Sequence, residues 1–208
     1  MLFFFYGTLM DDDVRADLLG GAVRELTVTP GVLLHHRRRS ARDGYYPVLV
    51  SETGGRVEGV FVDGVTRRLA MWVAHFEGTN YAPGAVTALD AAGRRVPAWS
   101  FLPTRGVAAS ARPWDLRVWQ RRHKPAARRA IAAWRREATS GHPLSLDAPW
   151  WVRRRIDAIA ACGETPPVRP ASSNGRTAPS ARLIQIPAAA DGDNPARADA
   201  PMLGVAAQ

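Results

Sequence analysis

The N-terminal segment Phe3-Phe4-Phe5-Tyr6 restricts the fold of this chain more than any other feature of its 208 residues. Four consecutive aromatic side chains cannot all face water, so both faces of the segment must be covered by apolar groups. Gly7 follows at once, and it permits either a positive φ or the close approach of other atoms to the backbone. The segment is therefore typical of a buried strand, over residues 2–6, that ends in a tight loop.

The rest of the first half alternates short apolar runs with turn residues. Acidic residues 11–13 suit the first turn of a helix that ends at Gly20-Gly21, and a second helix is expected over residues 66–76. Further strands are expected at residues 22–29, 31–35, 46–50, 57–62, 84–89 and 95–102, with turns at 43–44, 54–55, 63–64 and 91–93. This pattern predicts an α+β fold, a small mixed β-barrel or curled sheet with flanking helices.

The second half of the chain is helical in pattern. Residues 113–137 have helical spacing, and Pro125 is expected to open a second helix after a break. Another helix is expected to begin with Asp147 as its N-cap and to end at Cys162-Gly163. The remainder is rich in proline, alanine and glycine without periodicity, which predicts a disordered tail. We therefore divide the chain into a domain at 1–110, a helical extension packed on it at 111–163, and a tail at 164–208.

The composition limits which cellular compartment and which binding partners we expect for this protein. The single cysteine, Cys162, excludes an internal disulfide, and no apolar run reaches the roughly 18 residues of a membrane-spanning helix. The N-terminal segment lacks the basic region of a signal peptide, so we expect a cytoplasmic protein with no membrane partner. The net charge of +9 raises nucleic-acid binding as a hypothesis. However, every basic residue except Lys124 is arginine, a bias that a GC-rich genome also produces, and we favour that explanation.

Two short motifs place polar groups beside buried segments. In Tyr6-Gly7-Thr8-Leu9, the N–H groups of a loop after a strand can bind an anion. The motif Phe76-Glu77-Gly78, followed by Tyr81, sets a carboxylate among apolar neighbours, where burial raises its pKa. An ordinary turn and a surface glutamate are the simpler explanations of the two motifs. A glutamate at a helix C-terminus is electrostatically unfavourable, however, and this favours a functional role for Glu77.

Together, and in this order, the two motifs resemble those of the gamma-glutamylcyclotransferase-like (avirulence-induced-gene-like) family. The resemblance covers residues 2–102 and implies an enzyme that cyclises a small γ-glutamyl amide or amine to 5-oxoproline and releases the amine. It implies that Glu77 is the general base and acid. The histidines have no metal-ligand spacing, so we expect neither a metal nor another cofactor. The substrate-binding residues that the resemblance implies are Tyr6, Gly7, Thr8, Leu9, Tyr46 and Tyr81.

Two positions depart from the family pattern, and they keep a second function open. Pro83 stands where relatives often have arginine, and Phe101 where they frequently have tyrosine. A catalytically silent protein that binds a γ-glutamyl-like metabolite or a protein partner is therefore the alternative hypothesis. The helices between residues 114 and 163 resemble an extension found in some bacterial relatives, and we assign them no chemistry.

A third hypothesis is nucleic-acid binding by the arginine-rich helices. Tryptophans between the arginines can stack on bases, although their helical spacing favours packing against the domain. The tryptophans concerned are Trp119, Trp134, Trp150 and Trp151. The identity of the leaving amine and the oligomeric state stay open from the sequence.

Overall fold

The aromatic segment forms β1 (Phe3–Phe5), a buried strand in the wall of a β-barrel. It pairs antiparallel with β3 (Pro47–Asp63) and parallel with β5 (Arg95–Pro103). The computed structural model describes residues 1–141, 150–161 and 166. Phe3 and Phe4 are fully buried, as a run of aromatic residues requires.

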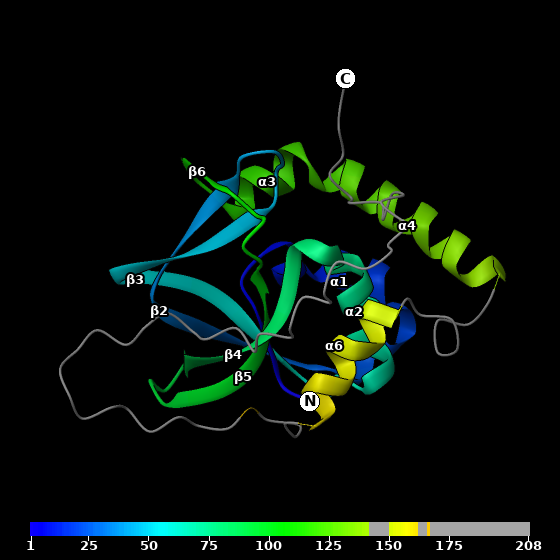
Figure 1. Ribbon diagram of the computed structural model, residues 1–208, viewed down its shortest axis with the longest axis horizontal. Coiled ribbons are helices and arrows are strands. Elements are labelled where there is room, and N and C mark those ends of the chain that lie inside the picture. The colour runs from blue at the N-terminus through cyan, green and yellow to red at the C-terminus, as the bar shows by residue number, and fades with distance from the viewer. Residues whose placement is uncertain (142–149, 162–165, 167–208) are drawn as a thin grey trace, which may run out of the picture.

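Five strands close the barrel, and a sixth extends its edge (Figure 1). The remaining strands are β2 (Thr27–Ala41), β4 (Tyr81–Asp90) and β6 (Ala109–Pro113). The strand order is β3-β1-β5-β4-β2, and a long antiparallel pairing between β2 and β3 completes the ring. The predicted α+β fold with a small mixed barrel is therefore confirmed.

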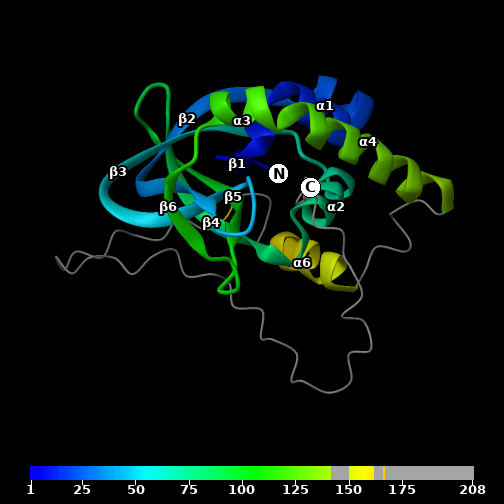
Figure 2. The same cartoon turned by 90° about the horizontal axis from the view of Figure 1, so that it is seen from above.

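The helices gather at one end of the barrel and above it (Figures 1 and 2). The two helices predicted in the first half are present as α1 (Asp12–Leu19) and α2 (Arg67–Glu77), with Asp11 and Thr66 as N-caps. The second half contributes α3 (Leu116–Arg122), α4 (Lys124–Gly141) and α6 (Trp150–Ala161). Pro125 lies in the first turn of α4, after a break at His123, as the sequence predicts. None of the helices in the described ranges has the length and hydropathy needed to cross a membrane.

The barrel and the later helices share one apolar cluster. Trp119, Trp134 and Ile156 belong to the same buried cluster as Phe3 and lie close to the helices of the first half. A second cluster fills the interior of the barrel around Phe4 and Phe61. Because the first cluster runs across residue 110, the division of the chain at that residue stays a prediction. Burial of Trp119 and Trp134 also leaves these two rings unable to stack on bases.

Several of the expected strand and turn limits were wrong. The separate strands expected at residues 22–29 and 31–35 are replaced by one continuous strand, β2. Residues 22–25 belong to a 3-10 helix, Gly20–Glu25, because Gly20 ends α1 with a φ of 67° and the following alanine and glutamate favour a helical turn. The turn expected at residues 54–55 is a bulge within β3. There Gly54 has a φ of 76°, and a Cβ on Gly55 would lie 2.5 Å from the carbonyl oxygen of His36.

The start of the second half also differs from expectation. Residues 109–113 pair with β2 as β6, and the helix expected from residue 113 begins at Leu116 with Asp115 as its N-cap. Alternation in β6 is too short to distinguish it from a loop by sequence. The expected helix start at Asp147, the end at Cys162-Gly163 and the tail at 164–208, apart from Pro166, lie outside the described residues.

Candidate active site

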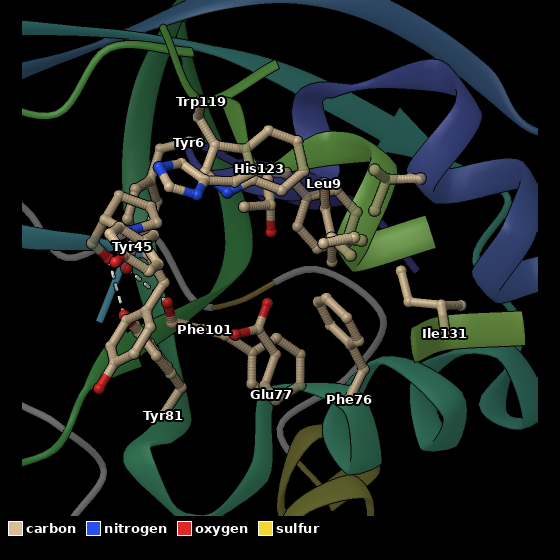
Figure 3. A pocket seen from close by; sticks show the side chains of 18 of the residues that line it. Tyr6, Leu9, Tyr45, Phe76, Glu77, Tyr81, Phe101, Trp119, His123 and Ile131 are labelled. Carbon is tan, nitrogen blue, oxygen red and sulfur yellow. Dashed lines mark hydrogen bonds between the residues drawn. The ribbon is translucent and has the colours of Figure 1, made fainter. Parts of the chain in front are cut away.

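A cavity of about 310 Å³ lies where the end of β1, the end of α2 and the α3–α4 junction meet (Figure 3). All seven residues singled out from the sequence line it: Tyr6, Gly7, Thr8, Leu9, Tyr46, Glu77 and Tyr81. Their roles in binding and catalysis stay predictions. The structure therefore brings together two motifs that lie about seventy positions apart in the sequence.

Glu77 is the last residue of α2, and its carboxylate points into the middle of the cavity (Figure 3). Gly78 follows with a φ of 61°, the left-handed conformation in which glycine ends a helix at little cost. Burial raises the pKa of Glu77 to about 8, and the positive charge of Arg155 acts in the opposite direction. A carboxyl group with this pKa changes its protonation state near neutral pH, as an acid-base catalyst requires.

Arg155 on α6 holds the turn that follows Glu77. Its guanidinium donates hydrogen bonds to the carbonyl oxygen of Gly78 and, over 3.4 Å, to that of Thr79. The same group lies 5.0 Å from the ring centre of Trp151, and the side chain is buried. Burial lowers the pKa of Arg155 to about 10, and Glu77 opposes this change. The sequence analysis missed this residue, although an arginine on the same helix face as Trp151 and Ile159 was a usable signal.

The loop after β1 depends on close packing rather than on an unusual φ. Gly7 has a φ of −122°, and a Cβ added to it would lie 2.7 Å from Cγ of Pro47. A short 3-10 helix, Thr8–Met10, follows. The N–H of Met10 donates to the carbonyl oxygen of Gly7 over 2.9 Å, whereas the N–H groups of Thr8 and Leu9 have no acceptor within the helix. Arg38 donates a hydrogen bond to the carbonyl oxygen of Tyr6 over 3.1 Å, which fixes the start of the loop.

The three predicted tyrosines are held by hydrogen bonds to the protein. The Tyr6 hydroxyl donates to the carbonyl oxygen of Phe101 over 2.8 Å, and the Tyr81 hydroxyl donates to that of Pro47 over 2.7 Å. Burial raises the pKa values of Tyr6 and Tyr81, and the charge of Glu77 adds to the effect in both. Both hydroxyls therefore keep their protons and can act toward a ligand only as acceptors.

Of the three tyrosines, Tyr46 is the one whose hydroxyl can exchange its hydrogen-bond partner for a ligand. Its hydroxyl donates to Oδ1 of Asp43 over 2.9 Å and accepts a hydrogen bond from the side-chain amide of Asn80 over 3.4 Å. Burial, followed by the hydrogen bond and charge of Asp43, raises the pKa of Tyr46 to about 12. Asp43 is exposed, so a ligand can displace it as the acceptor of the Tyr46 proton.

The helices to which sequence reasoning assigned no chemistry form one wall of the cavity. Four of the lining residues repeat at a spacing of four along α3 and α4: Trp119, His123, Ala127 and Ile131. Such a stripe indicates a helix face turned toward the domain, and it was the signal that could have identified this wall. The ring of His123 stacks on Tyr45 with 3.9 Å between ring centres, and burial lowers its pKa.

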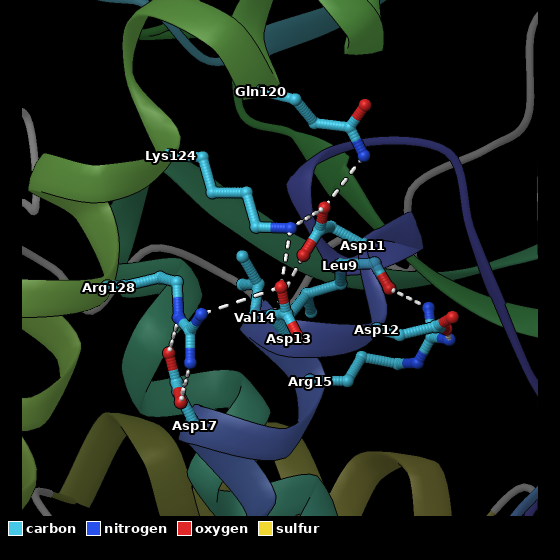
Figure 4. Close-up of polar contacts among 10 residues, drawn as sticks. All are labelled: Leu9, Asp11, Asp12, Asp13, Val14, Arg15, Asp17, Gln120, Lys124 and Arg128. Carbon is cyan, nitrogen blue, oxygen red and sulfur yellow. Dashed lines mark hydrogen bonds and ion pairs between the residues drawn. The ribbon is translucent and has the colours of Figure 1, made fainter.

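A cluster of charged residues fixes that wall to α1 (Figure 4). Lys124 donates hydrogen bonds to Asp11 and Asp13 over 2.7 Å each, and Gln120 donates to Asp11 over 2.7 Å. Arg128 adds a two-point contact with Asp17. Burial raises the pKa of Asp11, but the hydrogen bonds from Lys124 and Gln120 outweigh it and lower the pKa overall. The buried carboxylate is thus ionised and fully partnered, as its position requires.

His75, two residues before Glu77, packs against the later helices. Its ring lies between those of Trp134 and Trp151, at 4.9 Å and 6.0 Å. Burial lowers its pKa, and its Nδ1 atom has no hydrogen-bond partner among the described residues. Within those same ranges, no group of three or more His, Cys, Asp or Glu side chains is arranged to hold a metal ion.

Several solved structures are similar to this chain. The solution structure of the Arabidopsis thaliana protein At5g39720.1 is 20% identical, covers 68% of this chain and 93% of its own, and has a TM-score of 0.47. The Arabidopsis thaliana protein At3g28950.1 is 19% identical, with 71% and 91% covered and a TM-score of 0.46. A protein named gamma-glutamyl cyclotransferase is 12% identical, with 76% and 98% covered and a TM-score of 0.44. Similarities this distant do not identify a substrate.

Sequence similarity identifies the family to which this chain belongs. None of the curated proteins matches the chain significantly. The family described as gamma-glutamyl cyclotransferase, AIG2-like, matches residues 3–121, more than half of the chain, and this segment contains Glu77 and the loop at Gly7. This chain therefore belongs to the gamma-glutamyl cyclotransferase, AIG2-like family.

Proposed function

We propose that this protein converts a γ-glutamyl amide or amine into 5-oxoproline and a free amine, with Glu77 as general base and acid. The observation that carries the proposal is the position of Glu77, whose carboxylate faces a cavity of about 310 Å³ and whose pKa is raised to about 8 by burial. Membership of the family supports the same reaction class.

The reaction requires the enzyme to hold the substrate in a bent conformation more than it requires a reactive side chain. The α-amine of the γ-glutamyl unit attacks its own side-chain carbonyl carbon, a five-membered ring closes, and the bond from that carbon to the leaving nitrogen breaks. A cavity that holds the unit in this bent form gives the high effective concentrations of an intramolecular reaction. N–H groups at the start of the Thr8–Met10 helix are suited to the substrate carboxylate or to the developing oxyanion.

Glu77 accounts for the proton transfers. The α-nitrogen enters as an ammonium group and leaves as the ring N–H, so it loses two protons. The leaving nitrogen enters as an amide N–H and departs as an ammonium group, so it gains two. One carboxylate between the two nitrogens can carry each proton in turn and end in its starting form.

The raised pKa fits this role because the substrate itself carries a positive charge. In the free protein, Glu77 is mostly protonated at neutral pH. A bound ammonium group lowers the pKa of a neighbouring carboxyl group, which brings Glu77 into its basic form at the moment a base is needed. The catalytic protonation state thus depends on a correctly placed substrate.

A panel of γ-glutamyl amides and peptides tests the proposal, with 5-oxoproline as the measured product. We expect release by the wild type and a loss of about 100-fold or more in Glu77→Gln, the range for removal of a general acid-base group. Glu77→Asp is the conservative control, because it keeps the carboxylate and withdraws it by one methylene. Release at the wild-type rate by Glu77→Gln contradicts the role of Glu77.

One observation favours the alternative, a protein that binds the same class of compound without turnover. Phe101 lines the cavity where relatives frequently have tyrosine, so a hydroxyl is missing from the cavity wall. A ligand-induced rise in melting temperature with the same panel, without 5-oxoproline release from any member, would establish binding and exclude catalysis.

A further inference from the structure

The cavity has two chemically different ends, with Glu77 between them (Figure 3). Tyr45 and Tyr81 lie on one side of its carboxylate, and Phe76 and Ile131 lie on the other. The base must reach both the attacking and the leaving nitrogen of the substrate. The two parts of the substrate therefore occupy the two ends, one on each side of Glu77.

The tyrosine end suits the γ-glutamyl unit. Gly7 packs directly against Pro47, so the start of the loop after β1 belongs to this end. Tyr46 supplies a hydroxyl there, and Pro47 and Tyr81 complete the wall. A unit that carries an ammonium and a carboxylate group needs such polar partners, because a buried charge without them is costly.

The opposite end has no group that can partner a charge. Phe76 and Ile131 lie on this side, and Ala127 precedes Ile131 by one turn of α4. Leu9 and Val14 belong to the same apolar cluster and also line the cavity, and none of these residues is ionisable. Leu9, Val14 and Ile131 are buried at this end, whereas Phe76 and Ala127 are partly exposed. A carboxylate or ammonium group here would lose its hydration without a replacement.

We propose that this apolar end, the apolar subsite, binds the leaving part of the substrate and selects uncharged apolar amines. The inference rests on the proposed function. The cavity volume of about 310 Å³ stands at the lower limit of the range for pockets that bind small organic ligands, so the leaving group that it accepts beside the γ-glutamyl unit is a small aliphatic or aromatic one. Arg122 also borders the cavity, but it is exposed, so a carboxylate paired with it would lie at the mouth rather than in the apolar subsite.

A matched pair of substrates tests the inference directly. γ-Glutamyl-isopentylamide and γ-glutamyl-leucine differ only by one carboxylate on the leaving amine. We expect kcat/KM for 5-oxoproline release to be at least about tenfold higher for the isopentylamide, because the carboxylate has no partner in the apolar subsite. Equal values, or a preference for the leucine compound, overturn the inference but leave the proposed function standing. If neither compound nor γ-glutamyl-ethylamide turns over, the proposed function fails and the inference fails with it.

Two variants of α4 separate the subsite from general effects on the helix. Ala127→Leu places added bulk in the apolar subsite, and Ala132→Leu places the same bulk on an exposed position of the same helix. We expect Ala127→Leu to raise KM for the isopentylamide about tenfold while changing that for the ethylamide much less. Ala132→Leu should leave the KM values for both substrates unchanged. An equal effect of Ala127→Leu on both substrates contradicts the subsite, and so does a preference for the leucine compound that disappears in Arg122→Gln.

Discussion

The guanidinium of Arg155 donates a hydrogen bond to the carbonyl oxygen of Gly78, the residue directly after Glu77. A helix that the sequence suggested only as an extension thus holds the backbone beside the proposed base. The contact joins α6 to the end of α2 and brings one positive charge close to a carboxyl group in an apolar setting.

Arg155→Met should therefore affect the chemistry as well as the fold. Loss of the positive charge raises the pKa of Glu77 further, so the acid limb of the pH profile of kcat/KM should move to higher pH. Arg155→Lys keeps the charge and should leave the limb near its original position, even where the lost hydrogen bonds reduce stability. Arg154→Met, on an exposed neighbour, is the control. An unchanged limb in Arg155→Met would show that Arg155 is structural only.

The pH dependence of the wild type follows from the same pKa. Because Glu77 must be ionised to act as a base, kcat/KM should fall about tenfold for each pH unit below about 8. Steady-state rates between pH 5 and 9, with a buffer-independent assay of 5-oxoproline, measure this limb. A flat profile across that range would mean that no buried carboxyl group limits the reaction.

Glu77 should also make stability depend on pH. A carboxyl group whose pKa is raised on folding favours the folded state below its unfolded pKa, and this contribution is lost as pH rises to the folded value of about 8. The Glu77→Gln variant has no titratable group at this position, so its stability does not fall in this way. The melting temperature of the variant minus that of the wild type should therefore increase from about pH 4.5 to about pH 8 and then level off. A constant difference across this range contradicts the raised pKa.

The loop after β1 should not tolerate a side chain at Gly7. In Gly7→Ala the added Cβ would lie 2.7 Å from Cγ of Pro47, so the ring must move and the cavity wall with it. Overpacking of this kind costs about 1–3 kcal/mol in the free energy of unfolding. Gly21→Ala is a matched control, because no atom lies within 4 Å of the added Cβ. Chemical denaturation of both variants compares them, and equal stabilities would show that the loop adapts freely.

Lys124→Met should loosen the wall formed by α4. Asp11 keeps Gln120 and the N–H of Val14 but loses its charged partner, a loss of about 1–3 kcal/mol for a buried group. The pKa of Asp11 is lowered on folding, so the loss should shrink as pH falls through that value. Arg129→Met, exposed on the same helix, should be nearly neutral. Equal denaturation midpoints for the two variants would contradict a role for this ion pair.

The parts that could be predicted from the sequence are those with strong local signals. The aromatic run of β1, the acidic residues 11–13 at the start of α1 and the motif around Glu77 each carry a strong local signal, and the two motifs indicated the cavity. The bulge at Gly54 and the strand β6 could not be recognised, because both depend on pairing with β2. Arg155 was missed for the same reason, since its hydrogen-bond acceptors lie on a distant segment.

The most direct test of the central claim is the rate of 5-oxoproline formation from one accepted γ-glutamyl amide, wild type against Glu77→Gln, under conditions where both proteins are shown to be folded. With Glu77 as the base, the rate falls by about 100-fold or more in the variant while the melting temperature at pH 8 stays equal or rises. Wild-type rates in a folded Glu77→Gln protein would contradict the assignment of Glu77 and with it the mechanism proposed for this cavity.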